Sequence, residues 1–161
     1  MDNDWIKQSL AGFDTVWQRV AGDHGPPHEE VYSEENVLRK LIHSEICAAR
    51  QASSLARMFQ GDGRAILLRH AADAKRHIRR LRAEYFIHTG ICPDRDSDCQ
   101  EPCGKLASLR AALFQTNERA DMYTQAAKQT ESAELRQMYE TFACDAMRHA
   151  REIRALLIES F

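Results

Sequence analysis

Glycine and proline are scarce in this sequence of 161 residues, which contains 7 glycines and 4 prolines. Both residue types interrupt regular secondary structure, so long stretches without them favour long, unbroken elements. Most of them gather in three segments, at residues 22–30, 61–63 and 89–104, and a softer polar break falls at residues 128–134. These breaks divide the chain into one short N-terminal stretch and four long ones.

The sequence also lacks a long apolar run and a strong excess of charge of either sign. No stretch of about 18 apolar residues is present, and the N-terminal residues do not resemble a secretion signal. The formal net charge is −2, and the 29% of charged residues mix both signs. Such a mixture is typical of solvated helix faces and argues against a nucleic-acid groove or a membrane-surface patch. We therefore expect a cytoplasmic protein whose partners include neither nucleic acid nor membrane.

The five cysteines are too few and too unevenly placed for a secreted disulfide scaffold. Cys47 and Cys144 lie in helical patterns, where a cysteine is usually a small buried hydrophobe. Cys92, Cys99 and Cys103 crowd the third glycine–proline segment, but their spacing lacks the paired Cys-x-x-Cys of zinc ribbons. We expect these three to staple a loop or to have no special role, with reversible thiol chemistry as a further alternative.

Between the breaks, apolar residues recur every three to four positions, which is the period of an amphipathic α-helix. No window alternates apolar and polar residues for long enough to predict a strand. The pattern predicts helices at residues 3–21, 34–60, 63–89, 105–129 and 132–160. We accordingly expect an all-α protein with two parts, an N-terminal amphipathic helix and linker at residues 1–33 and a four-helix bundle at residues 34–161.

The lengths of the connections predict how the four long helices are joined. The first and third connections are short, so each is expected to join an antiparallel helical hairpin. The middle connection has about 15 residues and spans up to about 50 Å when extended. A helix of 27 residues is only about 40 Å long. The middle connection can therefore cross the length of the bundle and leave the second and third long helices parallel.

A five-residue motif occurs twice, as Asp73-Ala-x-Arg-His77 and as Asp145-Ala-x-Arg-His149. Both copies resemble the Asp-Glu-x-x-His motif that the second and fourth helices of rubrerythrins and other ferritin-like di-iron proteins carry. Residues 139–157 are similar to the fourth helix of that family, and Tyr123-x-x-Ala-Ala127 is similar to the third. The resemblance covers residues 34–160 and implies a ferritin-like bundle of two hairpins joined by one long crossover.

The resemblance also implies where a metal site would lie. In the family, the glutamate of each Glu-x-x-His bridges two irons, and one further glutamate on each of the other two helices holds one iron. In this sequence Ala74 and Ala146 occupy the two bridging positions, so nothing there can bridge a pair of metals. The histidines that match the family's ligands are His77 and His149. Because the methyl groups of Ala74 and Ala146 cannot bind a metal, the resemblance implies a site for one metal or for none.

The upstream glutamate of the first hairpin is matched by Glu45, which lies in an apolar helix face where an unpaired carboxylate is costly. The equivalent position of the second hairpin is Thr116. The nearest carboxylate, Glu118, falls almost opposite the apolar face of its helix and is expected to point outward. Asp73 and Asp145 match the family's acids that orient a ligating histidine through its other ring nitrogen.

Two hypotheses follow from this set of residues. In the first, Glu45, His77 and His149 hold one divalent metal, with iron ahead of zinc or manganese, and Thr116 bonds to water on that metal. That site would suit an oxidoreductase or a protein that handles iron or peroxide. In the second, the bundle is a metal-free scaffold or binding module, in which an ionised Glu45 pairs with protonated histidines braced by the two aspartates. Neither hypothesis says whether the protein is an enzyme. The resemblance further suggests a homodimer.

Overall fold

The computed structural model describes residues 32–93, 98–99 and 102–161. Residues 32–161 form one compact unit. The helix predicted at residues 3–21, together with most of the predicted linker, lies outside the described residues. The fold below is therefore that of the predicted bundle alone.

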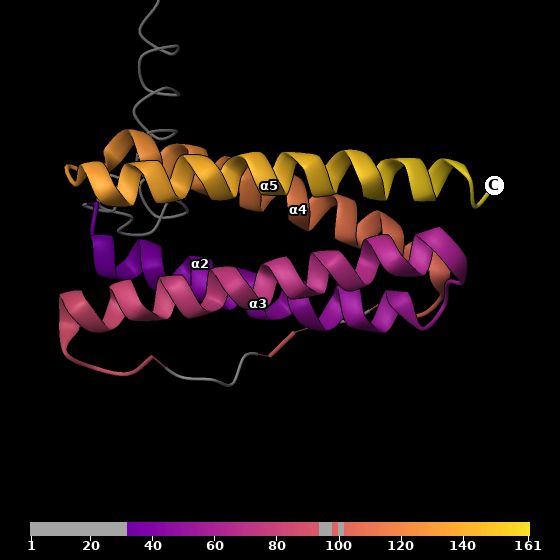
Figure 1. Ribbon diagram of the computed structural model, residues 1–161, viewed down its shortest axis with the longest axis horizontal. Helices are drawn as coiled ribbons and strands as arrows, with labels where there is room; N and C mark the ends of the chain where they lie inside the picture. The colour runs from indigo at the N-terminus through magenta and orange to yellow at the C-terminus, as the bar shows by residue number, and fades with distance from the viewer. Residues whose placement is uncertain (1–31, 94–97, 100–101) are drawn as a thin grey trace, which may run out of the picture. The chain divides into compact units, whose positions relative to one another are not determined.

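Four long helices make up the described chain, and no strand occurs among these residues (Figure 1). Their bounds are α2 at Glu34–Ala56, α3 at Gly61–Thr89, α4 at Lys105–Gln129 and α5 at Ala133–Ile158. The predicted all-α bundle and its four long helices are confirmed, with ends that differ by at most four residues. No helix in the described part of the chain has both the length and the hydropathy needed to cross a membrane.

Local sequence signals explain where the helices begin. Ser33 caps α2, because its hydroxyl oxygen accepts a hydrogen bond from the backbone N–H of Asn36 at 3.5 Å. Ser132 caps α5 in the same way and accepts from the N–H of Leu135 at 3.3 Å. These caps satisfy backbone donors that have no partner inside the helix. The two hairpins therefore begin at defined residues.

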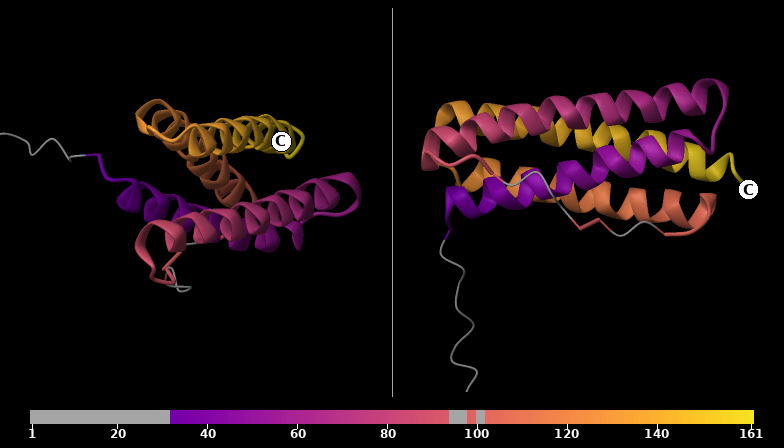
Figure 2. Two further views of the ribbon diagram at one scale, coloured as in Figure 1. Left: turned by 60° about the vertical axis from the view of Figure 1, so that its left-hand side comes forward. Right: turned by 90° about the horizontal axis from the view of Figure 1, so that it is seen from below.

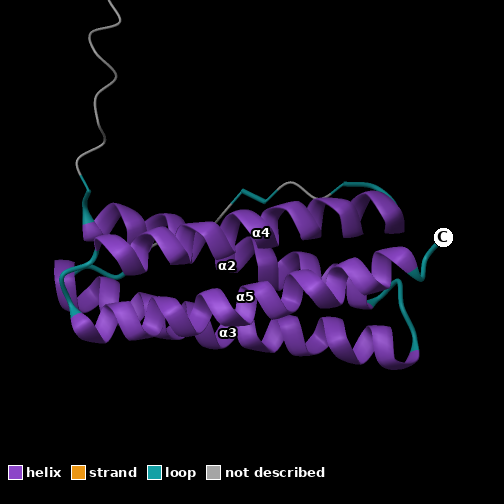
Figure 3. Cartoon of the chain, turned by 90° about the horizontal axis from the view of Figure 1, so that it is seen from above, coloured by secondary structure: helices purple, strands orange, loops and turns teal. Residues whose placement is uncertain are grey.

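The helices pack as two antiparallel hairpins, α2 with α3 and α4 with α5 (Figures 1 and 3). α3 ends and α4 begins at opposite ends of the bundle, so these two helices run in the same direction. The disulfide between Cys99 and Cys47 places this point of the connection beside α2, and Figure 2 shows the two hairpins from two further sides. Two helix pairs are in contact between the hairpins. α2 packs closely against α4, whereas α3 packs more loosely against α5. This is the arrangement that the connection lengths predicted.

The interior consists of two apolar clusters separated by a polar layer. One cluster lies toward the start of α2 and α5, and the other lies toward the opposite end of the bundle. The first includes Leu38, Leu41, Leu81, Tyr123, Tyr139 and Phe142, and the second includes Leu55, Leu67, Leu109, Ile153 and Leu156. Each helix passes through both clusters, so the polar side chains between them are held on rigid elements.

A disulfide joins Cys47 of α2 to Cys99 of the long connection. The prediction that Cys47 is a small hydrophobe is therefore wrong, and Cys144 is exposed rather than buried. The expected loop staple does exist, but its partner lies on a helix 52 residues away. Cys92 and Cys103 are free and exposed. Sequence spacing did not reveal this pair, because a disulfide depends on the distance between two Cα atoms in the fold.

Gly90 ends α3 in the left-handed region, with φ of 69°, and its N–H donates to the carbonyl oxygen of Phe86. A Cβ at this position would meet nothing within 4 Å, so any cost of a side chain comes from the backbone alone. We expect Gly90→Ala to lower the free energy of unfolding by about 1 kcal/mol. Gly90→Asn should cost less, because asparagine tolerates this conformation. Urea denaturation of the two variants measures this difference, and equal costs would contradict it.

Candidate functional site

The polar layer at the middle of the bundle contains the repeated motif and receives side chains from all four helices. Its buried ionisable members include Glu45 of α2 and His77 of α3, each 2% exposed, and Arg119 of α4, which is 5% exposed. Thr116 of α4 and His149 of α5 are also buried there. Three ionisable side chains in so apolar an interior must neutralise one another, because an unpaired buried charge is costly.

The Glu45 carboxylate is the centre of this layer. Its Oε1 atom accepts a hydrogen bond from the Tyr123 hydroxyl at 2.7 Å, lies 3.0 Å from His77 Nδ1, and lies 3.5 Å from Arg119 Nε. Burial alone would raise the pKa of Glu45, but the Arg119 charge and the His77 hydrogen bond outweigh it and hold this pKa below its usual value. Glu45 is therefore an ionised carboxylate that pairs with Arg119 and lies within hydrogen-bond distance of His77 and Tyr123.

Both ring nitrogens of His77 face carboxylates. Nδ1 lies beside Glu45, and Nε2 lies 3.1 Å from Asp145 Oδ2 on the opposite hairpin. Because ionised carboxylates only accept hydrogen bonds, the ring must carry a hydrogen on each nitrogen to satisfy both. The ring also stacks on Phe142, with centroids 3.8 Å apart. Both ring nitrogens of His77 are therefore positioned to donate to carboxylates, and neither is directed at an open metal position.

His149, the histidine of the second motif, differs from His77 in its surroundings. Its Nε2 lies 3.0 Å from Asp73 Oδ2, and its ring centroid lies 4.0 Å from that of His70. Burial and the neighbouring His70 lower the pKa of His149 to about 4, although the Asp73 hydrogen bond opposes this. Burial likewise lowers the pKa of His70, whose Nε2 lies 2.5 Å from Glu152 Oε2. Both rings are thus neutral near pH 7 and donate one N–H to a carboxylate.

The two arginines of the repeated motif, Arg76 and Arg148, form matching ion pairs with Asp73 and Asp145. Arg76 donates to Asp73 Oδ1 at 2.8 Å on its own helix and to Asp145 Oδ2 at 3.4 Å on the other hairpin. Arg148 donates to Asp145 Oδ1 at 2.8 Å on its own helix and to Asp73 Oδ2 at 3.0 Å on the other. Burial would raise the pKa of Asp73, but hydrogen bonds from Arg148 and His149 lower it to about 2. The repeated Asp, Arg and His thus all bond across the two hairpins.

The predicted site residues are only partly brought together. Glu45, His77 and Asp145 form one chain of contacts, and Asp73 and His149 form another. A cavity of about 20 Å³, lined among others by Thr116, Arg119 and His149, lies within the polar layer. Glu118 is exposed, as its place opposite the apolar face predicted.

Sequence reasoning missed Arg119 and Tyr123 as partners of Glu45. Tyr123 enters the sequence analysis only through its similarity to the third helix of the ferritin-like family, and that similarity predicts no role for its hydroxyl group. Arg119 lies three residues after Thr116 on the same helix, and its Nη2 donates to the Thr116 hydroxyl oxygen at 3.3 Å. One signal could have identified Arg119. It lies three residues after a buried position, in a bundle that has a buried glutamate on another helix.

The side chains in this arrangement do not fit a metal ion. Glu45 Oε1 already has three partners, both ring nitrogens of His77 face carboxylates, and the Arg119 guanidinium supplies positive charge beside the Glu45 carboxylate. In the part of the chain that the structure describes, no three or more His, Cys, Asp or Glu side chains are grouped so that they could hold one metal. The one-metal site made by Glu45, His77 and His149 stays a prediction, and the geometry favours the second hypothesis.

Known proteins do not assign this site a role. No protein-family model matches the sequence, and a search of curated proteins gives no significant match. The chemistry of the polar layer is therefore interpreted from its own geometry.

The protonation states of this layer predict a dependence of stability on pH. The pKa of His149 is 6.5 in an unfolded chain and about 4 in the folded protein, so between these values only the unfolded state gains the proton. The free energy of unfolding should fall as the pH is lowered from about 6.5 to about 4. His149 alone should contribute on the order of 3 kcal/mol, at about 1.4 kcal/mol for each pKa unit. Urea denaturation at several pH values measures this slope.

A pair of histidine variants separates this effect from general acid sensitivity. His149→Gln should flatten the slope between pH 6.5 and 4, whereas His88→Gln, which changes an exposed histidine, should leave it unchanged. His70 contributes to the slope with the same sign, because burial lowers its pKa as well. Midpoints that stay constant across this range in the wild-type protein would show that His149 is not buried in its neutral form.

Proposed function

We propose that this protein is a metal-free ferritin-like scaffold, in which a buried network of ion pairs takes the place of a metal centre. The observation that carries this proposal is the position of Arg119, whose guanidinium lies 3.5 Å from the Glu45 carboxylate. A metal in that layer would supply positive charge to the carboxylate, and the Arg119 guanidinium supplies it from the protein instead. Alanine at the two motif positions that would bridge metals supports the same interpretation.

The network also supports a scaffold because it joins the two hairpins. α3 and α5 pack most loosely among the helix pairs that are in contact, and several polar contacts cross between them. Four of these contacts are Asp73–Arg148, Asp73–His149, Asp145–Arg76 and Asp145–His77. Charge-assisted hydrogen bonds of this kind are stronger than neutral ones and fix geometry. Joining two halves of a bundle is what a shared metal would otherwise do.

Metal binding is the first test of the proposal. Purified protein incubated anaerobically with ferrous iron, zinc or manganese, then freed of unbound metal, should show no stoichiometric metal by elemental analysis. The thermal unfolding midpoint should not change when metal or a chelator is added, because no apo site would be waiting for an ion.

Two glutamate variants give the control for this test. If the protein instead holds one metal per chain, and Glu45→Gln loses it while Glu118→Gln retains it, the one-metal hypothesis is correct and the scaffold proposal is wrong. Glu118 is a suitable control because it is an exposed carboxylate that lies on α4, away from Glu45.

Truncating one partner of the buried pair should be costly. We expect Glu45→Gln to lower the free energy of unfolding by about 3–5 kcal/mol, because it leaves the buried Arg119 without its counter-ion. Arg119→Met should have a similar cost. The double variant should recover about half of the summed loss, since it removes both charges together. Denaturation of the four proteins measures the coupling, and strictly additive costs would show that the pair does not interact.

A further inference from the structure

The Cys47–Cys99 disulfide lies outside the polar layer, and each of its sulfur atoms has a nitrogen-bearing neighbour. Cys47 Sγ lies 3.8 Å from His43 Nε2, one turn earlier on α2. Cys99 Sγ lies 3.8 Å from Arg50 Nη1, one turn after Cys47 on the same helix. Cationic or proton-donating neighbours favour the thiolate form of a cysteine, which makes it both a better nucleophile at neutral pH and a better leaving group.

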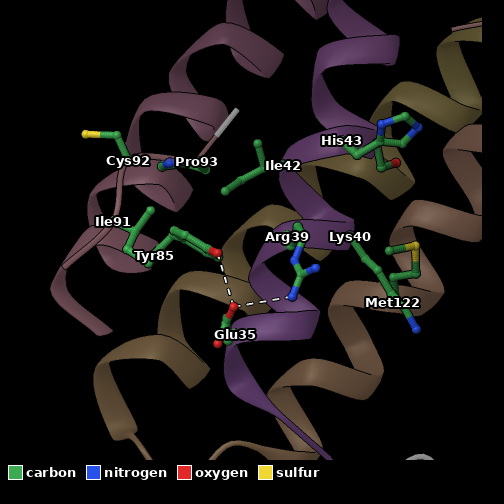
Figure 4. Close-up of a pocket in the computed structure, with 11 residues that line it drawn as sticks. Glu35, Arg39, Lys40, Ile42, His43, Tyr85, Ile91, Cys92, Pro93 and Met122 are labelled. Carbon is green, nitrogen blue, oxygen red and sulfur yellow. Dashed lines mark hydrogen bonds and ion pairs between the residues drawn. The ribbon is translucent and has the colours of Figure 1, made fainter. Parts of the chain in front are cut away.

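The disulfide is also accessible. A surface groove of about 360 Å³ is lined by both cysteines, by His43, and by side chains that include Asp98 and Glu118. A separate pocket of about 950 Å³ continues along α2 on the other side of His43 and reaches Tyr85 and Ile91 (Figure 4). His43 lines both of these hollows. A small thiol can therefore approach the disulfide from solvent without unfolding the bundle.

We propose that Cys47 and Cys99 form a thiol–disulfide exchange site that a dithiol reductant opens and an oxidant closes. A reductant thiolate is attracted by Arg50 and attacks Cys99 Sγ. The disulfide breaks, and its electron pair passes to Cys47 Sγ, which leaves as a thiolate beside His43 Nε2 and takes a proton from solvent. The second thiolate of the reductant then attacks the reductant sulfur that is bonded to Cys99, and the reductant leaves as a cyclic disulfide. Cys99 departs as a thiolate beside Arg50, and two electrons have moved from the reductant to the protein.

The fold explains what the exchange changes. The disulfide fastens the long connection to α2, while the two apolar clusters and the polar layer hold the four helices together without it. Reduction therefore frees the connection at Cys99 and leaves the helices folded. Asp98 and Glu118 place negative charge along the same groove, so a neutral dithiol should react faster than the anionic thiol glutathione.

The rate of reduction in the folded protein tests this proposal. The oxidised full chain is mixed with dithiothreitol at neutral pH without denaturant, and alkylation followed by mass spectrometry counts the reduced Cys47 and Cys99 over time. Both should become reduced while circular dichroism shows unchanged helix content. His43→Gln should react about threefold more slowly, which is the effect of a one-unit change in thiol pKa at a Brønsted coefficient near 0.5. Arg50→Gln should be slowed by a comparable factor.

Variants of the other exposed cysteines provide the controls. Cys92→Ser and Cys103→Ser should react at the wild-type rate, because neither residue belongs to the disulfide. The proposal is overturned if the bond opens only when denaturant unfolds the helices, if His43→Gln and Arg50→Gln both react as fast as wild type, or if the air-oxidised protein has five free thiols. Re-oxidation that restores the Cys47–Cys99 pair supports it, and re-oxidation to another pair counts against it.

Discussion

The buried charge of Glu45 is the constraint on which the rest of the interior depends. A carboxylate 2% exposed between two apolar clusters requires polar partners in contact, and two helices provide them. Arg119 comes from α4 and His77 from α3, so one carboxylate fixes the relative position of three helices. The other ring nitrogen of His77 lies 3.1 Å from Asp145, which brings α5 into the same network. One buried acid thus involves all four helices.

The two copies of the motif have the same contacts across the hairpins but different surroundings. His77 has carboxylates on both sides, whereas His149 lies beside one carboxylate and is kept neutral by burial and by His70. The difference arises on the partner helices, because the position on α4 that matches Glu45 is Thr116. A threonine is smaller than a glutamate and carries no charge, so it offers His149 no carboxylate, and both residues line a small cavity. Near-identical sequence therefore produces two different chemical environments.

Most of the fold could be predicted from the sequence, because its signals are local. Apolar periodicity defined the helices, connection lengths defined the hairpins, and the duplicated motif placed Asp145 beside His77 and Asp73 beside His149. Arg119 could not be predicted in this way, since an arginine on a helix is far more often solvated than buried. The Cys47–Cys99 pair was missed for a related reason, as it depends on how the long connection lies against α2. Both omissions concern contacts between segments distant in the chain.

The polar layer also explains why the two hairpins meet in a single register. Apolar clusters tolerate sliding, because one apolar side chain can replace another at similar cost. Moving α4 along α2 by one turn would separate Arg119 from Glu45 and leave two unpaired charges in an apolar interior, which costs far more. The polar layer is thus a poor source of net stability but a strong source of specificity, since it penalises every alternative packing. On this argument the repeated Asp, Arg and His together define how the two hairpins fit.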